Sequence, residues 1–278
     1  MSKVQESLFD QNSTHGDAAS KPFRKPAATR MERRTYLNNL LVEESLEHLP
    51  AALEHQDTAS FKAYLRDHLH QNSAKTRVKY AEYIAYRYSK DGQMNLALAW
   101  FIKSCPSPRS SREALWFETV RATPLLRELC EAWLSRLPEQ GASREDLLQF
   151  LGPRIGGRNP AKIATEAIGG IAKFGHLKKV RVKQYRAVWA EPTAETLAYA
   201  LAQLYPSPAV VQMETFKTNS LWQALLWPKA ALERMIIDGD RAGSIARVTK
   251  LDDYYQFILA GTGEERLRHF SQAWGGVR

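Results

Sequence analysis

The sequence predicts a mainly α protein, in which a helical bundle is followed by winged-helix-like units with short β-ribbons. Three observations lead to this class. Apolar residues recur at helical spacing through the first half, strand-like alternation is first seen near residue 178, and the order helix, turn, helix, ribbon occurs twice after the bundle. We expect a mobile tail over residues 1–34, a helical bundle over 35–137, a basic winged-helix-like unit over 138–192, and a C-terminal helical or winged-helix-like unit over 193–278.

The first two segments differ in apolar content. Residues 1–34 combine polar residues, Pro and Gly with scattered apolar positions, and such a tail cannot offset its chain entropy by burial. From Leu37 onwards, apolar residues follow helical spacing in successive segments. The residues that carry the pattern are Leu37, Leu40, Leu41 and Glu44; Phe61, Leu65 and Leu69 after Asp57; Val78, Ala81, Ala85 and Tyr88 after Ser73; Met94, Ala97, Leu98 and Phe101; Leu115, Trp116, Thr119 and Val120; and Leu126, Leu129, Cys130, Trp133, Leu134 and Leu137 after Pro124.

Residues 138–192 carry the signals of a winged helix. Capping residues, a proline at a first helical position and a terminating glycine predict two helices, and valines that alternate with cations predict a ribbon after them. The helical part has a capping box over residues 143–146, a turn over 152–157, and a helix from Asn159 and Pro160 to about Phe174 with Gly175 after it. The ribbon follows. Its first strand alternates Val180 and Val182 with Arg181 and Lys183, its turn is at Gln184 and Tyr185, and its second strand covers residues 187–189 and ends before Pro192.

The helix predicted over residues 160–174 has two distinct faces. Its apolar residues share one arc of about 140°, which is suited to burial. The buried arc holds Ile163, Ala164, Ala167, Ile168, Ile171 and Phe174, and the opposite arc holds Lys162, Thr165, Gly169 and Lys173. Two glycines inside a helix cost roughly 1 kcal/mol each relative to alanine, so each needs a reason. We expect Gly170 to allow close helix packing and Gly169 to allow close approach of a ligand.

Composition limits the class of protein. The 278 residues are 44% hydrophobic, which allows a buried core and excludes fibrous and wholly disordered chains. Cys105 and Cys130 are too few for a disulfide framework or a four-thiolate zinc site, so we expect a reducing compartment. No stretch approaches the roughly 20 apolar residues that span a bilayer, and the N-terminus lacks a hydrophobic signal core. We therefore expect a cytoplasmic protein with no membrane partner.

Positive charge is concentrated in one part of the chain. The 39 Lys and Arg exceed the 30 Asp and Glu, and residues 109–192 hold +6 of the net charge of +9. Residues 35–108 and 193–278 are balanced, whereas residues 154–186 hold nine cations and only Glu166 as an anion. The candidate nucleic-acid-binding residues are Arg154, Arg158, Lys162, Thr165, Gly169, Lys173, Lys178, Lys179, Arg181, Lys183 and Arg186.

This clustering favours a polyanionic partner, and double-stranded DNA fits the predicted order of elements. A helix with short polar and cationic side chains can enter the major groove, which is about 12 Å wide. The ribbon cations would then project toward phosphates or a narrow minor groove. The alternative is a solvated basic face on an ordinary helix–hairpin unit.

The sequence contains no recognisable catalytic or metal-binding motif. His68 and His70 are two residues apart on a predicted helix, so they point to different faces and are unsuited to a shared metal. Glu43, Glu44 and Glu47 are more typical of a solvated helical face than of a paired acid and base. We expect a protein that is not an enzyme and that needs no cofactor and no metal.

The C-terminal segment has the same predicted order of elements as the basic unit, but it has no excess of positive charge. Residues 221–227 and 228–238 are predicted helices, residues 244–259 are a predicted ribbon, and their cations are matched by nearby aspartates. A winged-helix-like unit without excess charge is more typical of protein contact or dimerisation than of DNA contact. We expect Trp222 and Trp227 to be core residues, with an anchoring role for a partner protein as the alternative.

Part of the chain resembles a known family. Leu40-Leu41 with Glu44-Ser45, then Ser-Ala-Lys-Thr-Arg at residues 73–77 before a helix, resembles the opening of the BrxA family of BREX phage-exclusion systems. The order that follows is similar too, with helices around 115–120 and Leu125-Leu126, and residues 162–177 running into a ribbon. The resemblance covers residues 40–189. The N-terminal tail and the unit after Pro192 depart from the family pattern.

The resemblance implies a NusB-like helical core, DNA binding and a non-enzymatic role in a multi-protein defence system that restricts phage DNA. It carries over Lys162, Thr165, Lys173 and Lys178, which the charge pattern also selects. Two hypotheses follow. The chain binds duplex DNA mainly through phosphates as an accessory protein of phage defence, or it is a scaffold or adaptor whose basic unit docks an acidic protein. A winged-helix transcription regulator is a near neighbour of the first.

Overall fold

The computed structural model describes residues 37, 40–137, 141–155, 159–251 and 254–275, with only the backbone of residues 273–275. The tail predicted over residues 1–34 lies outside the described residues. The mainly α class is confirmed, because helices dominate and the strands are short and antiparallel. Within the part of the chain that the structure describes, no helix is both long and apolar enough to cross a membrane.

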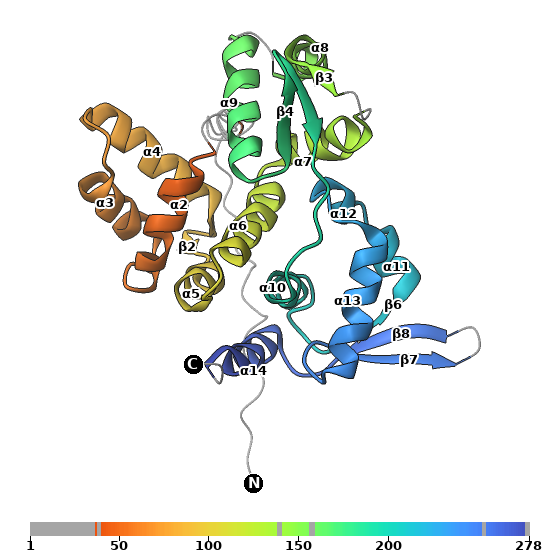
Figure 1. Cartoon of the computed structure of the whole chain (residues 1–278). Coiled ribbons are helices and arrows are strands. Elements are labelled where there is room, and N and C mark those ends of the chain that lie inside the picture. Colours follow the sequence, from red (N-terminus) through yellow and green to blue (C-terminus); the bar gives the residue numbers. More distant parts are fainter. Residues whose placement is uncertain (1–36, 38–39, 138–140, 156–158, 252–253, 276–278) are drawn as a thin grey trace, which may run out of the picture.

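The first part of the chain is a helical bundle, in which α2 and α5 pack against α6 and the pair α3 and α4 lies farther out (Figure 1). Leu41 has a left-handed φ of 49°, so the first described helix begins at Val42 and does not extend back through the preceding leucines. In chain order the elements are α2 (Val42–His48), the 3-10 helix η1 (Leu49–Leu53), α3 (Thr58–His68), α4 (Ala74–Arg87), β1 (Ser89–Lys90), β2 (Gln93–Met94), α5 (Leu96–Ser104) and α6 (Pro108–Ala122).

The next elements form a winged helix. Two helices separate a short first strand from the ribbon, and the antiparallel sheet has the order β3-β5-β4. The elements are α7 (Pro124–Ala132), the 3-10 helix η2 (Leu134–Arg136), β3 (Ala142–Ser143), α8 (Arg144–Ile155), α9 (Pro160–Lys173), β4 (Leu177–Arg181) and β5 (Gln184–Ala187). The predicted capping box is confirmed, because Ser143 Oγ accepts from Asp146 N at 3.1 Å and Asp146 Oδ2 accepts from Ser143 N at 2.7 Å.

The C-terminal part repeats this topology. Its antiparallel sheet has the order β6-β8-β7, which matches the first sheet strand for strand. The elements are α10 (Ala194–Leu204), β6 (Ala209–Gln212), α11 (Met213–Thr218), α12 (Ser220–Ala224), α13 (Lys229–Arg241), β7 (Arg247–Leu251), β8 (Tyr254–Leu259) and α14 (Gly263–Gly275). The last helix, α14, packs beside α10 (Figure 1). Trp222 and Trp227 are buried as predicted.

Trp116 of α6 joins the parts of the molecule. Its side chain is fully buried, and its ring stacks on His176 of the first winged helix, with the ring centres 4.8 Å apart. Its Nε1 donates a hydrogen bond of 3.2 Å to the carbonyl of Leu225 in the second winged helix. One continuous hydrophobic core therefore runs through the bundle and both winged helices.

Two local predictions were wrong. Strands β1, β2 and β3 precede residue 178, and each has two residues, which is too short to produce a visible alternation. Helix α8 continues through Gly152 and Pro153 to Ile155, where a turn was expected, because the buried side chains of Leu151 and Ile155 keep its last turn against the core. The rest of the predicted turn, residues 156–158, lies outside the described residues.

Candidate nucleic-acid interface

Helix α9 begins and ends as its sequence predicts. Asn159 adopts a left-handed φ of 44°, and its side chain accepts a hydrogen bond of 3.1 Å from the backbone N of Lys162. Pro160 occupies the first turn, where its missing N–H has no helical partner to lose. Gly175, with a φ of 88°, ends the helix and directs the chain into β4.

The two faces of α9 are confirmed. All six residues of the predicted apolar arc are buried, and Lys162, Thr165, Gly169 and Lys173 are all exposed. The buried face packs against the bundle at Gly170, where an added Cβ would lie 2.6 Å from Leu40 Cδ1. At Gly169 an added Cβ would meet no atom within 4 Å. The two glycines therefore have different roles, and Gly170 serves helix packing.

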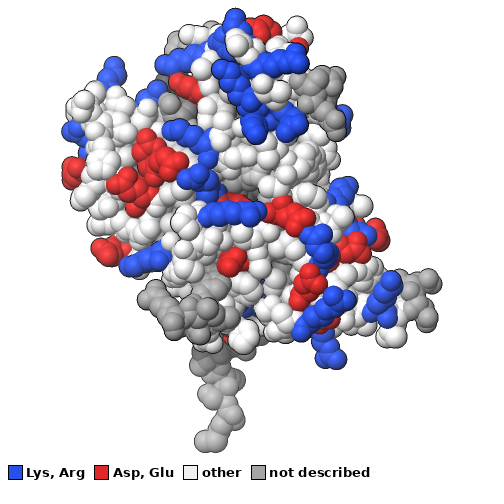
Figure 2. All heavy atoms as spheres, in the orientation of Figure 1, with Lys and Arg blue, Asp and Glu red and all other residues white. Residues whose placement is uncertain are grey.

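The cations around the end of α9 and on the ribbon are exposed and lack acidic partners. Figure 2 shows Lys and Arg side chains gathered over the upper unit, which holds α9 and β4, whereas Asp and Glu gather around α2. Among the described residues, none of these six cations forms an ion pair or a side-chain hydrogen bond: Lys173, Lys178, Lys179, Arg181, Lys183 and Arg186. We call these six residues the basic patch.

Two cations of the basic patch face each other across the ribbon. Lys178 of β4 is the antiparallel partner of Arg186 of β5, so the two side chains leave the same face of the sheet. Like charges directly opposite each other destabilise a sheet. Among the described residues, no carboxylate forms an ion pair with either cation.

Three other sequence-predicted residues are engaged within the protein. Arg154 is held by Glu128 of α7, with Nε 2.7 Å from Oε1, and its guanidinium stacks 3.9 Å from the centre of the Phe150 ring. Lys162 Nζ lies 3.8 Å from Glu166 Oε1. The Thr165 hydroxyl donates to the carbonyl of Ala161, one turn earlier in α9.

Arg154 therefore stabilises the contact between α7 and α8. Lys162 and Thr165 lie on the exposed face of α9, and each already has a partner within that helix. Arg158, the remaining candidate, lies outside the described residues. Among the described residues of the predicted set, the exposed cations without acidic partners are those of the basic patch, and Thr165 and Gly169 lie on the exposed face of α9.

The ribbon differs from its prediction at the turn. The strands meet at Val182 and Lys183, two positions before the turn expected at Gln184 and Tyr185, because Lys183 adopts a left-handed φ of 60°. Strand β5 therefore begins at Gln184 and ends at Ala187, whereas the second strand was expected over residues 187–189. Val180 and Val182 therefore do not face the core, and Val182 is 80% exposed at the tip. An exposed apolar residue between cations at the tip of a wing went unrecognised in the sequence, because valine alternation usually marks a buried face.

The second winged helix carries a different charge arrangement. Arg234 and Arg241 of α13 pair with Glu191 and Asp238, and Lys217 of α11 lies 3.0 Å from Glu233. Figure 2 correspondingly shows mixed charges over this unit. The two units share a topology, but only the first exposes a concentrated set of unpaired cations among the described residues.

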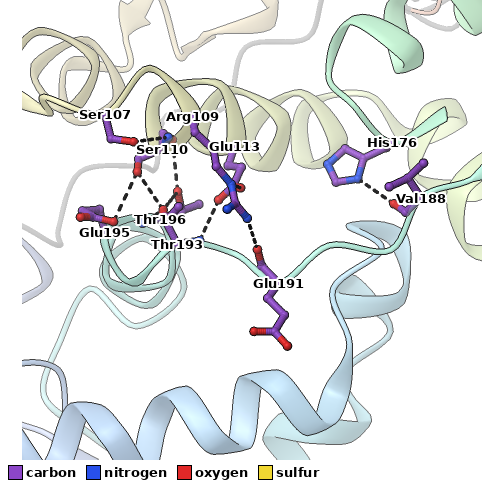
Figure 3. Close-up of polar contacts among 10 residues, drawn as sticks. All are labelled: Ser107, Arg109, Ser110, Glu113, His176, Val188, Glu191, Thr193, Glu195 and Thr196. Atoms are coloured by element: carbon purple, nitrogen blue, oxygen red, sulfur yellow. Dashed lines mark hydrogen bonds and ion pairs between the residues drawn. The ribbon is translucent and has the colours of Figure 1, made fainter. Parts of the chain in front are cut away.

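The segment between the two winged helices is fixed to α6 by a polar network (Figure 3). Arg109 donates to the carbonyl of Glu191 and to the carboxylate of Glu113, both at 2.7 Å. The other carboxylate oxygen of Glu113 accepts from Thr193 N at 2.8 Å. Because Glu113 is buried, its bond to Thr193 N is shielded from water, whereas Arg109 is largely exposed. Together these bonds hold the connecting segment in place.

His176 lies at the base of the ribbon, between Trp116 and β5. Its Nδ1 is 3.3 Å from the carbonyl of Val188, and its Nε2 is buried without a hydrogen-bond partner. Burial lowers the pKa of His176 to about 4, because a charged imidazole has no compensating group there. The ring is therefore neutral at physiological pH, and its Nδ1 donates to the carbonyl.

Comparison with known proteins shows a similarity in fold to a solved structure. No family model matches the sequence, and no curated protein matches it. The crystal structure of magnesium ion-bound SspB is similar to this chain, with a TM-score of 0.54 and 10% sequence identity. The similarity covers 84% of this chain and 86% of SspB. It therefore extends over both winged helices and the bundle, and at this identity it shows a shared fold alone.

Proposed function

We propose that this protein binds double-stranded DNA through the basic patch, mainly by contacts with phosphates. The observation that carries the proposal is the set of six exposed cations without acidic partners at the end of α9 and on the β4–β5 ribbon, two of which oppose each other at Lys178 and Arg186. Phosphates would relieve this repulsion, and they release counterions when cations neutralise them.

The fold supports a specific mode of contact. Helix α9 directly precedes the ribbon of its winged helix, and its exposed face has small or flexible side chains at Thr165, Gly169 and Lys173. Such a face can approach base edges in the major groove. The ribbon, with the cations and the exposed Val182 at its tip, then lies along the phosphate backbone or an adjacent minor groove.

The wider role proposed is that of a non-enzymatic accessory protein in a bacterial phage-defence assembly. This part rests on the resemblance of residues 40–189 to the BrxA family of BREX systems. In such a role the protein would hold phage DNA for other components, and its second winged helix would be free to contact them.

The test is binding of a fluorescent random-sequence duplex across a salt series. If all six cations neutralise phosphates, log Kd changes with log salt at a slope of about 5 in magnitude. The double variant Lys173→Glu with Arg181→Glu should weaken binding at least tenfold at moderate salt and lower the slope. Its helical circular dichroism should match the parent protein, because both side chains are exposed and unpartnered.

A matched control changes the same net charge in the second winged helix. Arg241→Glu with Arg247→Glu alters the last residue of α13 and the first residue of β7, both of which are exposed. Binding by this variant should fall much less. Equal loss in both variants would show a general charge effect, and full retention of duplex by the first variant would reject the basic patch as the site.

An adaptor role is the second candidate, and the second winged helix favours it. Its ribbon exposes Leu251 at 66% and Tyr254 at 65% beside balanced charges, which is typical of protein contact. In this version the basic patch docks an acidic protein surface. Absence of duplex binding at low salt, combined with salt-sensitive binding to an acidic protein, would favour the adaptor. A strong preference for one duplex sequence would favour a transcription regulator.

A further inference from the structure

Three metal-ligating side chains meet at the end of α2, away from the basic patch. Glu47 and His48 are the last two residues of α2, and His70 lies in the loop between α3 and α4. The Nε2 of His70 is 2.9 Å from Glu47 Oε1, and the Nε2 of His48 is 3.9 Å from Glu47 Oε2. The ligand atoms of all three residues lie within 4.8 Å of one another.

His48 is the buried member of this cluster. Its side chain is only 6% exposed, and its Nε2 is buried without a hydrogen-bond partner. A buried imidazole nitrogen without a partner is costly, because it has lost water and gained nothing in return. This nitrogen is directed toward Glu47 at a distance too long for a hydrogen bond, as expected for an atom that shares a ligand with its neighbour.

The surroundings of His48 favour a bound cation. The carboxylate of Glu44 adds negative charge nearby, and one of its oxygens is buried without a partner. The Tyr64 ring packs edge-on against His48, with ring centres 6.0 Å apart, and limits its movement.

We propose that Glu47, His48 and His70 form a site for a divalent transition-metal ion, with Zn²⁺ as the best fit. Two imidazole nitrogens and one carboxylate oxygen suit Zn²⁺, Co²⁺ or Ni²⁺, whereas Mg²⁺ prefers oxygen ligands throughout. Zn²⁺ lies about 2.0–2.2 Å from such ligands. The exposed Glu47 and His70 side chains reach it with small rotations, because the buried His48 is the fixed member.

The consequence is a link between two elements of the bundle. His70 is in a loop, where it contacts Glu47 through an exposed hydrogen bond and lies with its ring centre 6.1 Å from that of His48. The metal would replace this hydrogen bond with coordination by residues of both elements. A bound ion stabilises the folded protein by mass action, provided that the unfolded chain binds it weakly. The site lies on the bundle, so DNA binding by the basic patch is not required for it.

The test uses the full-length, untagged protein. Titration with ZnCl₂ should give one equivalent bound per chain and raise the melting temperature, and MgCl₂ at the same concentration should do neither. Titration with CoCl₂ should produce visible ligand-field absorption. His70→Gln should weaken Zn²⁺ binding at least tenfold, because altering even an outer-shell partner of a metal ligand typically costs 10–100-fold. The variant should fold normally, since His70 is 75% exposed at its side chain.

His68→Gln is the matched control. His68 is two residues away and also exposed, but its Nδ1 contacts the carbonyl of Tyr64 and it is outside the cluster. This variant should keep parental Zn²⁺ affinity and the cobalt spectrum. The proposal is overturned if Zn²⁺ fails to bind in the micromolar range, if His70→Gln binds as tightly as the parent protein, or if the two variants lose affinity equally.

Discussion

Gly170 of α9 lies directly against Leu40, which precedes the first helix of the bundle. A Cβ at Gly170 would be 2.6 Å from Leu40 Cδ1 and 2.9 Å from Leu40 Cβ, so the side chain cannot simply rotate away. Gly170→Ala should therefore destabilise the protein by about 1–3 kcal/mol, the usual cost of overpacking, in spite of the better helix propensity of alanine. Urea unfolding followed by circular dichroism measures the change.

The neighbouring glycine is the control for this prediction. Gly169 faces solvent, and an added Cβ meets no atom within 4 Å. Gly169→Ala should stabilise the protein by roughly 0.5–1 kcal/mol, because only helix propensity changes. If both alanine variants shift the free energy of unfolding in the same direction, the packing of α9 on Leu40 is wrong.

The opposed cations of the ribbon predict a conflict between stability and binding. Lys178→Gln removes one of two like charges that face each other across β4 and β5, and it should raise the free energy of unfolding by about 0.3 kcal/mol at low salt. The gain should disappear at 1 M salt, where the Debye length is about 3 Å. Duplex binding should weaken in the same variant.

Lys179→Gln separates the two effects. Lys179 lies opposite Tyr185, so its neutralisation relieves no cross-strand repulsion. Stability of this variant at low salt should match that of the parent protein, and duplex binding should still weaken. A stability gain equal to that of Lys178→Gln would indicate general charge reduction in place of the pairwise repulsion.

The network on α6 predicts a large effect from one buried carboxylate. Glu113→Ala removes the acceptor for Arg109 and for Thr193 N, and the loss of a hydrogen-bonded buried group should cost about 1–3 kcal/mol. The exposed pair Glu264 and Arg268 in α14 provides the comparison, because Glu264→Ala should change the free energy of unfolding by less than about 1 kcal/mol. Thermal unfolding of both variants at one protein concentration tests the difference.

Helix α9 shows what the sequence was able to predict. Its cap at Asn159, its end at Gly175 and both of its faces follow from local chemistry, because capping and helical periodicity depend on residues a few positions apart. The packing role of Gly170 was also expected, although its partner Leu40 was not, since 130 positions separate the two residues in the sequence.

Contacts between distant segments limited the prediction of the site. Arg154 was assigned to the basic surface, but Glu128 from α7 pairs with it. His70 was considered only with His68, whereas the fold brings it to His48 and Glu47 from another helix. The two-residue strand β3 was missed because its pairing with β5 depends on residues more than 40 positions later. Local patterns do not encode such partners.

His176 predicts a specific loss of stability in mild acid. Its pKa is about 4 in the folded protein and about 6.5 in the unfolded chain, so below pH 6.5 the unfolded state binds a proton that the folded state does not. The folded state should lose about 2 kcal/mol from this residue between pH 7 and pH 5. His176→Phe keeps an aromatic ring against Trp116 and removes the titrating group. Urea unfolding of both proteins at the two pH values should show a smaller loss for the variant, and an equal loss would mean that His176 is solvated or paired.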